Sequence, residues 1–96
     1  MEDQEIIDLY WMRDENAIRE TARKYGTYCR AIAKNILPVS EDQEECISDT
    51  WLRAWNAIPP QRPAKLKAFL GRITRNLAIN RLRDACSQKR GGGIQH

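Results

Sequence analysis

The sequence contains too few histidine and cysteine residues for the commonest catalytic and metal sites. Its one histidine, His96, follows a run of glycines near the end of the chain, so the folded part offers no imidazole as a general base. The three cysteines, Cys29, Cys46 and Cys86, form no C-x-x-C pair, whereas structural zinc needs four clustered ligands. No G-x-S-x-G or P-loop motif is present. We therefore expect no enzyme activity, no metal site, no cofactor and no disulfide framework, with free thiols buried in a reducing compartment.

The sequence also lacks a long hydrophobic run. No segment approaches the roughly 18–20 consecutive apolar residues that a membrane-spanning helix requires. The first residues, Met1 to Glu5, are acidic, whereas a signal peptide begins with a positively charged segment. The sequence therefore predicts a cytoplasmic protein with no membrane contact.

Acidic residues are almost missing from the second half of the chain. Residues 51–96 contain ten Lys and Arg but a single acid, Asp84, whereas residues 1–50 contain twelve acids and six bases. The net charge of +3 over 96 residues therefore conceals −6 in one half and +9 in the other. This division indicates either two different partners, one of them a nucleic acid, or two halves that neutralise each other. Charge alone leaves both interpretations open.

Hydrophobic residues recur at helical spacing along the chain, and no strand pattern or internal repeat is present. Between residues 15 and 37, apolar or small residues are separated by alternating steps of four and three, which places them on one helix face. Trp51 lies on the apolar stripe of the third helical segment and Trp55 flanks it, so both are expected in the core. The sequence predicts an all-α fold, a compact bundle of about four helices at residues 4–12, 15–37, 40–58 and 64–85.

Capping and turn residues mark the ends of these helices. Asp14 is a candidate N-cap of the second helix, and Ser40 followed three residues later by Gln43 is typical of a capping box. Three prolines in residues 59–63 predict a stiff, extended connection before the last helix. Gly26 lies inside the second helix, where it costs ~1 kcal/mol relative to alanine and leaves room for a close helix crossing. Residues 87–93 have the composition of a flexible linker.

The last predicted helix carries a basic face without acids to balance it. On a 100° helical wheel, bases and asparagines gather away from the apolar stripe, and no acid precedes Asp84 in this helix. Such a face suits contacts to phosphates and base edges, and the alternative is pairing with the acidic first half. The face consists of Lys65, Arg72, Arg75, Asn76 and Arg83, with Asn80 and Arg81 at the borders of the apolar stripe. The expected stripe is Leu66, Phe69, Leu70, Ile73 and Leu77, which leaves Ile79 and Leu82 unassigned.

The third predicted helix presents a different surface. Residues 41–58 contain five acids and one base. Leu52 points away from the expected core, beside Glu45, Ser48 and Asp49. An acidic face with a central apolar residue is typical of a protein-docking surface, and the alternative is an ordinary solvated face with one exposed leucine.

Two segments together resemble a known family. Residues 40–55 (SEDQEECISDTWLRAW) resemble the helix by which bacterial sigma factors dock on core RNA polymerase. Residues 69–83 (FLGRITRNLAINRLR) are similar to their promoter −10 recognition helix. Their order, their spacing and the proline-rich connection also match. Residues 3–90 therefore look like region 2 of the extracytoplasmic function (ECF) group of sigma factors.

The resemblance implies two binding sites and no catalysis. The docking site, which would contact the coiled coil of the polymerase β′ subunit, falls on Glu45, Ser48, Asp49 and Leu52. Where the family usually has Gln-Glu, this chain has the shorter pair Ser48-Asp49. The site for the non-template strand of the −10 element falls on the last helix and on the preceding connection, near a flipped-out base. Its residues are Arg72, Arg75, Asn76, Asn80 and Arg83, with Arg62 and Lys65 from the connection.

Further expectations follow from the same resemblance. Residues 64–75 contain only one aromatic residue, Phe69, as in the ECF group, which predicts weak promoter melting and dependence on a close promoter match. Residues 1–90 would form region 2 and residues 91–96 the start of a linker, with the C-terminal −35-binding domain absent. An anti-sigma factor is a further possible partner. The alternative function is a helical protein–protein adaptor whose basic face binds an acidic partner.

Overall fold

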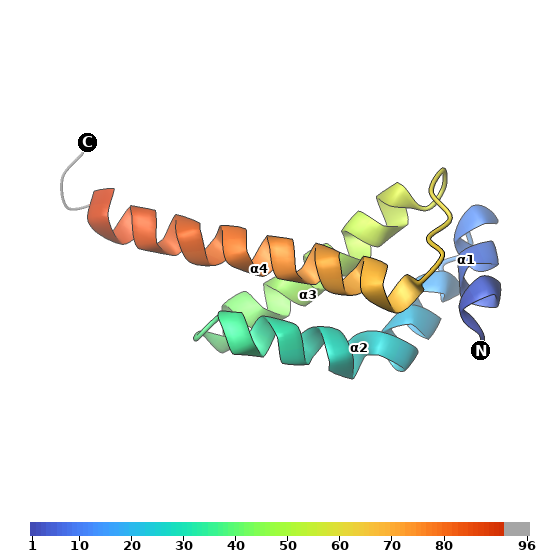
Figure 1. The fold of residues 1–96 in the computed structure, drawn as a ribbon, viewed down its shortest axis with the longest axis horizontal. Helices are drawn as coiled ribbons and strands as arrows, with labels where there is room; N and C mark the ends of the chain where they lie inside the picture. The colour runs from blue at the N-terminus through green and yellow to red at the C-terminus, as the bar shows by residue number, and fades with distance from the viewer. Residues whose placement is uncertain (92–96) are drawn as a thin grey trace.

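The computed structural model describes the backbone of residues 1–91 and the side chains of residues 1–85. Its helices are α1 (Asp3–Trp11), α2 (Asn16–Ile36), α3 (Ser40–Ala57) and α4 (Leu66–Gly91) (Figure 1). No strand occurs within these described residues, so the predicted all-α fold is confirmed. The predicted helix boundaries agree to within two residues, except at the end of α4.

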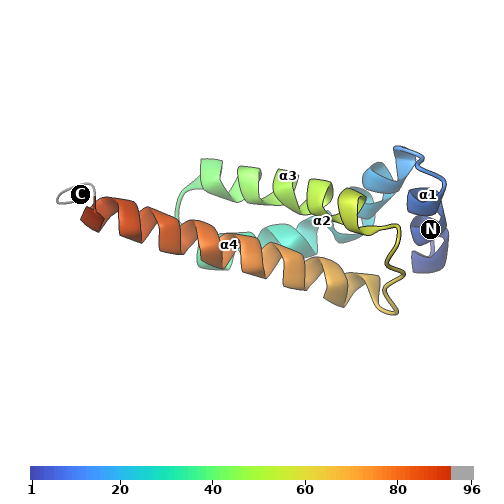
Figure 2. The same cartoon turned by 90° about the horizontal axis from the view of Figure 1, so that it is seen from above.

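Three helices form the body of the molecule. α2, α3 and α4 pack against one another, and α1 crosses one end of this group, where it contacts α2 (Figure 1 and Figure 2). The last turns of α4 extend beyond α2 and α3 in both views. At about 1.5 Å per residue, α4 alone is ~39 Å long. This length accounts for most of the 50 Å long axis of the molecule.

The core extends along the contacts between α2, α3 and α4 and includes one face of α1. Ile6, Ile7 and Tyr10 of α1 are completely buried. Trp51 and Trp55 are partly buried against this core, as the sequence predicts. The rings of Tyr10 and Trp55 lie 6.1 Å apart in a tilted arrangement, which favours aromatic packing.

The buried face of α4 differs in part from the predicted stripe. Leu66 and Leu70 are completely buried, as expected, but so are Thr74 and Ala78, which the sequence pattern did not assign to the core. The Thr74 hydroxyl donates to the carbonyl of Leu70 at 2.9 Å and lies 3.1 Å from the hydroxyl of Thr50 on α3. Because both hydroxyls are satisfied by backbone carbonyls, threonine can occupy a helix–helix contact without an unpaired polar group.

The predicted capping box at Ser40 is wrong. Ser40 is the first residue of α3 and Val39 occupies the N-cap position, with no side-chain hydrogen bond to the helix end. The Gln43 amide instead donates to the carbonyl of Leu37 at 2.8 Å. The predicted N-cap at Asp14 is also wrong, because Glu15 occupies the N-cap position of α2 and forms no side-chain hydrogen bond to the helix end. The Asp14 carboxylate accepts from the Asn16 backbone N–H at 2.9 Å, one residue outside the N-cap.

The close approach between helices lies at Gly71 rather than at Gly26. A Cβ atom placed on Gly26 would have no atom within 4 Å outside its own helix, so the room that this glycine leaves is not used for a close helix crossing. A Cβ atom on Gly71 would lie 2.6 Å from the hydroxyl oxygen of Tyr28. Glycine at position 71 of α4 therefore lets the Tyr28 side chain of α2 lie against the α4 backbone.

The last helix continues past its predicted end. α4 extends to Gly91, so residues 86–91, part of which had a linker-like composition, are helical. Serine, glutamine, lysine and arginine are all tolerated in helices, whereas consecutive glycines are not. Of the predicted linker at residues 91–96, only Gly91 lies inside the described residues.

Arg13 fixes the corner between α1 and α2 to the end of α3. Its backbone has φ = 55°, a left-handed conformation that is energetically unfavourable for residues other than glycine. Its guanidinium donates to the carbonyls of Trp55 at 2.9 Å and Ile58 at 3.0 Å and lies 3.7 Å from the centre of the Trp55 ring. Arg13 thereby satisfies carbonyls at the C-terminal end of α3, where the proline-rich connection begins.

Two further structural findings concern membranes and metals. No helix in the described part of the chain is long and apolar enough to cross a bilayer. Among the described side chains, no three His, Cys, Asp or Glu residues gather in a way that could hold a metal ion.

Candidate protein-docking and nucleic-acid surfaces

The acidic patch of α3 is joined to α4 by one arginine. Arg81 donates from Nη1 to Glu45 at 2.8 Å and from Nη2 to Asp49 at 2.9 Å. Glu45 and Asp49 lie one turn apart on α3, so a single guanidinium reaches both carboxylates. The hydrogen bond to Asp49, followed by the one to Glu45, raises the pKa of Arg81. The patch predicted for docking is therefore partly neutralised by a residue of the same chain.

The remaining predicted docking residues are freely accessible. Ser48 is exposed, and the side chain of Leu52 is 57% exposed. A groove of about 170 Å³ beside Leu52 is lined by Asp49 and by Leu77 of α4, among others. The acidic patch, defined as Glu45, Ser48, Asp49 and Leu52, thus combines charge with an exposed apolar side chain at its C-terminal end.

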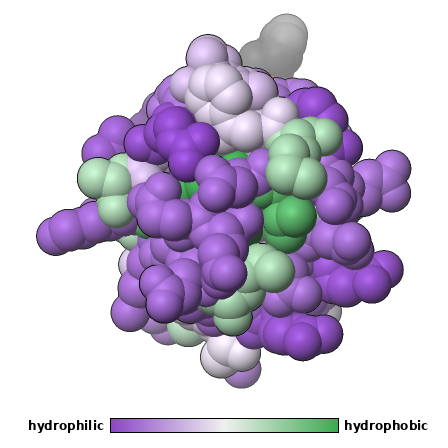
Figure 3. All heavy atoms as spheres, turned by 90° about the vertical axis from the view of Figure 1, so that its right-hand side faces the viewer, coloured by the Kyte–Doolittle hydropathy of each residue, from purple (hydrophilic) through white to green (hydrophobic). Residues whose placement is uncertain are grey.

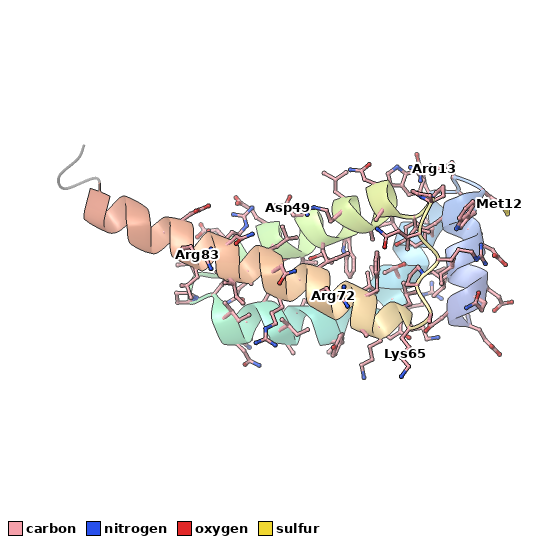
Figure 4. All side chains as sticks on the ribbon, turned by 45° about the horizontal axis from the view of Figure 1, so that its top comes forward. Met12, Arg13, Asp49, Lys65, Arg72 and Arg83 are labelled. Carbon is pink, nitrogen blue, oxygen red and sulfur yellow. The ribbon has the colours of Figure 1, made fainter. Side chains whose placement is uncertain are left out.

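The bases on the exposed face of α4 form no ion pairs with described side chains. Arg72, Arg75 and Arg83 are exposed, and none of them forms an ion pair with any described side chain. Asn76 and Asn80 are exposed between them. Figure 4 shows Lys65 at the start of α4, Arg72 and Arg83 further along it, and Asp49 on the adjoining α3. We call the exposed set Lys65, Arg72, Arg75, Asn76, Asn80 and Arg83 the basic face.

Of the predicted DNA-binding residues, Arg62 already forms hydrogen bonds with residues of α1. Its guanidinium donates to Asp8 of α1 at 2.7 Å and to Gln4 at 3.4 Å, and it lies 5.5 Å from the centre of the Trp11 ring. Arg62 therefore ties the connection between α3 and α4 to α1. Lys65, three residues later, is exposed and makes no ion pair with a described residue.

The alternative in which the basic helix pairs with the acidic half is correct only in part. Of the described bases in α4, Arg81 alone pairs with acids of the first half. Sequence reasoning placed Arg81 at the border of the apolar stripe but did not include it in either site. The sequence does contain two acids four residues apart on α3 and an arginine on α4, a combination that permits such a double ion pair. Whether the three residues meet depends on how the two helices are packed, which the sequence pattern does not show.

The end of the molecule formed by α1 shows no comparable surface. Trp11 and Met12 are 41% and 69% exposed there. Seen from this end, the surface is mostly hydrophilic with small, separate hydrophobic patches (Figure 3). Scattered apolar residues of this kind are common on protein surfaces and do not define a binding site.

The arrangement defines a helical binding domain that presents an acidic patch and a basic face on adjoining helices. The family model described as Sigma-70 region 2 matches residues 21–87, more than half of the chain. The chain therefore belongs to the sigma-70 region 2 family, whose members are non-enzymatic transcription initiation factors that bind core RNA polymerase and promoter DNA. Comparisons with curated proteins and with solved structures give no match.

Proposed function

We propose that this chain is region 2 of an ECF-type sigma factor, which docks on core RNA polymerase through the acidic patch of α3 and binds the non-template strand of the promoter −10 element through the basic face of α4. Residues 1–90 form this domain. The protein acts in the cytoplasm.

The docking half of the proposal is supported by chemistry and exposure. Two carboxylates and an exposed leucine follow one another along one face of α3, and the coiled coil of β′ is the partner that the family binding mode implies. Apolar side chains beside charged ones are common in protein interfaces. The carboxylate of Glu45 remains 63% exposed and that of Asp49 47% exposed in their pairs with Arg81, so both can still accept hydrogen bonds from a partner.

The DNA half is supported by bases that have no partner within the described part of the chain. Arg72, Arg75 and Arg83 lie on one exposed side of α4 with Asn76 and Asn80 among them. Guanidinium groups bind phosphates, and carboxamides can form paired hydrogen bonds with adenine edges. The paucity of aromatic residues at the start of α4 supports a domain that depends on sequence contacts more than on melting power.

The observation that carries the proposal is the division of charge between adjoining helices, with an acidic patch on α3 and unpaired bases on α4. Co-purification with core polymerase tests the docking half. Asp49→Arg should abolish co-purification while the far-ultraviolet circular dichroism spectrum stays unchanged. Glu44→Arg is the matched control, because Glu44 lies on α3 outside the acidic patch and pairs with Arg30 of α2. Wild-type recovery of Asp49→Arg would refute the docking assignment.

The salt dependence of binding to single-stranded DNA separates the proposal from the adaptor alternative. Each neutralised phosphate contributes a slope of about −0.7 to the plot of log K against log salt concentration for single strands. We expect a slope of about −2 or steeper for the holoenzyme on the −10 non-template strand if Arg72, Arg75 and Arg83 each contact a phosphate. Binding that is undetectable, or that is insensitive to salt, would favour the adaptor.

A further inference from the structure

Two cysteines in the core, Cys29 of α2 and Cys46 of α3, take no part in either proposed binding surface. Both side chains are completely buried, and both thiols are free. The Cys46 thiol donates to the Thr74 carbonyl of α4 at 3.5 Å. Burial raises the pKa of the Cys29 thiol, and the neighbouring Thr74 partly opposes that rise. Both thiols therefore border the same residue, at the point where α2, α3 and α4 meet.

The register of α2 against α3 also places the two cysteines opposite each other. These helices contact each other and are joined by residues 37–39, so they run in opposite directions (Figure 1). Arg30 of α2 forms an ion pair with Glu44 of α3. Cys29 lies one residue before Arg30 and Cys46 lies two residues after Glu44, so both cysteines lie one short step further from the connection. Burial raises the pKa of Cys46, and a charge on Cys29 adds to this rise, which indicates that the two sulfur atoms are close enough to interact.

We propose that Cys29 and Cys46 form a reversible disulfide when the protein meets hydrogen peroxide, and that this bond acts as a redox switch on the contact between α3 and α4. A disulfide requires two cysteines whose side chains face each other across closely spaced backbones. Opposed positions on antiparallel helices, both with short side chains, supply that arrangement. In a reducing compartment such a bond is transient, which is the usual property of a redox sensor.

The reaction balances with peroxide as the oxidant. One thiolate attacks a peroxide oxygen, the O–O bond breaks, and a sulfenic acid and hydroxide form. The second thiol then attacks the sulfenic sulfur, and the S–S bond forms as the S–O bond breaks and water leaves. Overall, two thiols lose two electrons and two protons, and one peroxide becomes two waters. Because burial keeps both thiols protonated near neutral pH, oxidation requires a transient opening of the core and responds to sustained exposure.

The disulfide changes the contacts next to the acidic patch. Once the Cys46 sulfur is bonded to Cys29, it no longer donates to the Thr74 carbonyl, so α3 loses one hydrogen bond to α4. Thr74 lies seven residues before Arg81 on α4, or about two turns, and Cys46 directly follows Glu45 on α3. The lost contact therefore adjoins the ion pairs that hold Arg81 on the acidic patch. Weaker pairs leave the carboxylates more available to a partner, so oxidation favours docking. This consequence rests on the proposed function, whereas formation of the bond does not.

The first test follows the bond in the purified full chain carrying Cys86→Ser, which leaves Cys29 and Cys46 as its only thiols. After peroxide treatment at low protein concentration, we expect the chain to lose both free thiols and the mass of two hydrogen atoms, and to stay monomeric on a non-reducing gel. Dithiothreitol should restore both thiols. Cys29→Ala in the same background is the matched control, because it cannot form the bond and should show no such loss of mass.

Two results of the first test would overturn the proposal. Both thiols of the folded chain could persist under peroxide that oxidises the urea-unfolded chain, which would make them inert core residues. Alternatively, the mass could rise by whole oxygen atoms, which would mean sulfinic or sulfonic acids in place of a disulfide.

The second test measures the affinity for core polymerase by surface plasmon resonance before and after oxidation. Oxidation should raise the affinity by up to about fivefold, the effect that we also expect of Arg81→Ala, and should add nothing in the Arg81→Ala variant. Equal affinities of the reduced and oxidised chains would overturn the switch, even if the bond forms. If the reduced chain does not bind core polymerase at all, the proposed function fails and the effect on docking fails with it, whereas the thiol test still decides whether the bond forms.

Discussion

Arg81 of α4 and Asp49 of α3 join the two proposed binding surfaces through a hydrogen bond of 2.9 Å. The same guanidinium reaches Glu45 at 2.8 Å, so one residue of the proposed DNA-binding helix covers two carboxylates of the acidic patch. A cation of core polymerase that contacts these carboxylates must therefore compete with Arg81. The relationship makes Arg81 a determinant of docking strength, although it belongs to neither predicted site.

Removing Arg81 should strengthen docking slightly. The carboxylates of both pairs are more than a third exposed, and exposed pairs contribute about 0–1 kcal/mol. Arg81→Ala should therefore lower the free energy of unfolding by less than ~1 kcal/mol and raise the affinity for core polymerase by up to about fivefold. Urea titration measures the first effect and surface plasmon resonance the second. A loss of affinity would show that the pair instead orients the carboxylates for the partner.

The bases of the predicted DNA site should not contribute equally. Arg83 has no ion-pair partner among the described side chains, whereas Arg62 must leave Asp8 before it can contact a phosphate. Arg83→Ala should reduce the salt slope of single-strand binding by ~0.7, the value of one phosphate contact. Arg62→Ala should leave that slope within error. Equal reductions in the two variants would mean that the contact with Asp8 does not persist in the bound protein.

Arg13 should stabilise the domain through its contacts with the end of α3. Arg13→Ala removes the hydrogen bonds to the carbonyls of Trp55 and Ile58 together with the contact on the Trp55 ring, and should cost about 1–2 kcal/mol. Arg13→Gly loses the same contacts but relieves the left-handed backbone, so it should be more stable than Arg13→Ala by ~1 kcal/mol. Chemical denaturation of both variants gives the difference. Equal stability would show that the φ of 55° carries no strain.

Gly26 of α2 and Gly71 of α4 should respond differently to alanine. Gly26→Ala meets no neighbouring atom and should raise the free energy of unfolding by about 0.5–1 kcal/mol through helix propensity. Gly71→Ala gains the same propensity, but its Cβ would lie 2.6 Å from the Tyr28 hydroxyl oxygen, so the tyrosine must move. We expect Gly71→Ala to be at least ~1 kcal/mol less stable than Gly26→Ala. Combining Gly71→Ala with Tyr28→Phe, which removes the clashing oxygen, should recover part of that difference.

Stability should decline at alkaline pH. Burial raises the pKa of both Cys29 and Cys46, because a buried thiolate is poorly solvated. The folded-state pKa lies above the unfolded value of about 8.5, so the contribution of each thiol is complete below that pH and is lost as pH rises through the folded pKa. Urea midpoints should therefore fall between pH 7.5 and 9.5. The double variant Cys29→Ala and Cys46→Ala should show a flatter pH dependence, and an unchanged dependence would assign it to other groups.

Local patterns in the sequence determined the helices and the family. Steps of three and four between apolar residues specify helix faces, and the prolines at residues 59–63 separate the last two helices, because both effects act within a few residues. The tandem segments at residues 40–55 and 69–83 carried the family resemblance for the same reason. The capping box at Ser40 failed because neighbouring backbone positions compete for the N-cap, and one residue of shift cannot be read from a motif alone.

The tertiary structure alone decided which side chains meet. Whether Arg62 faces DNA or Asp8, and whether Arg81 is free or paired with Asp49, depends on how neighbouring helices cross and on their register. The same holds for the close contact at Gly71. These relationships join residues more than 30 positions apart, and periodicity within one helix contains no information about the residue that lies opposite on another. The sequence by itself therefore determined the two charged helices, and only their packing determined which charges remain available for a partner.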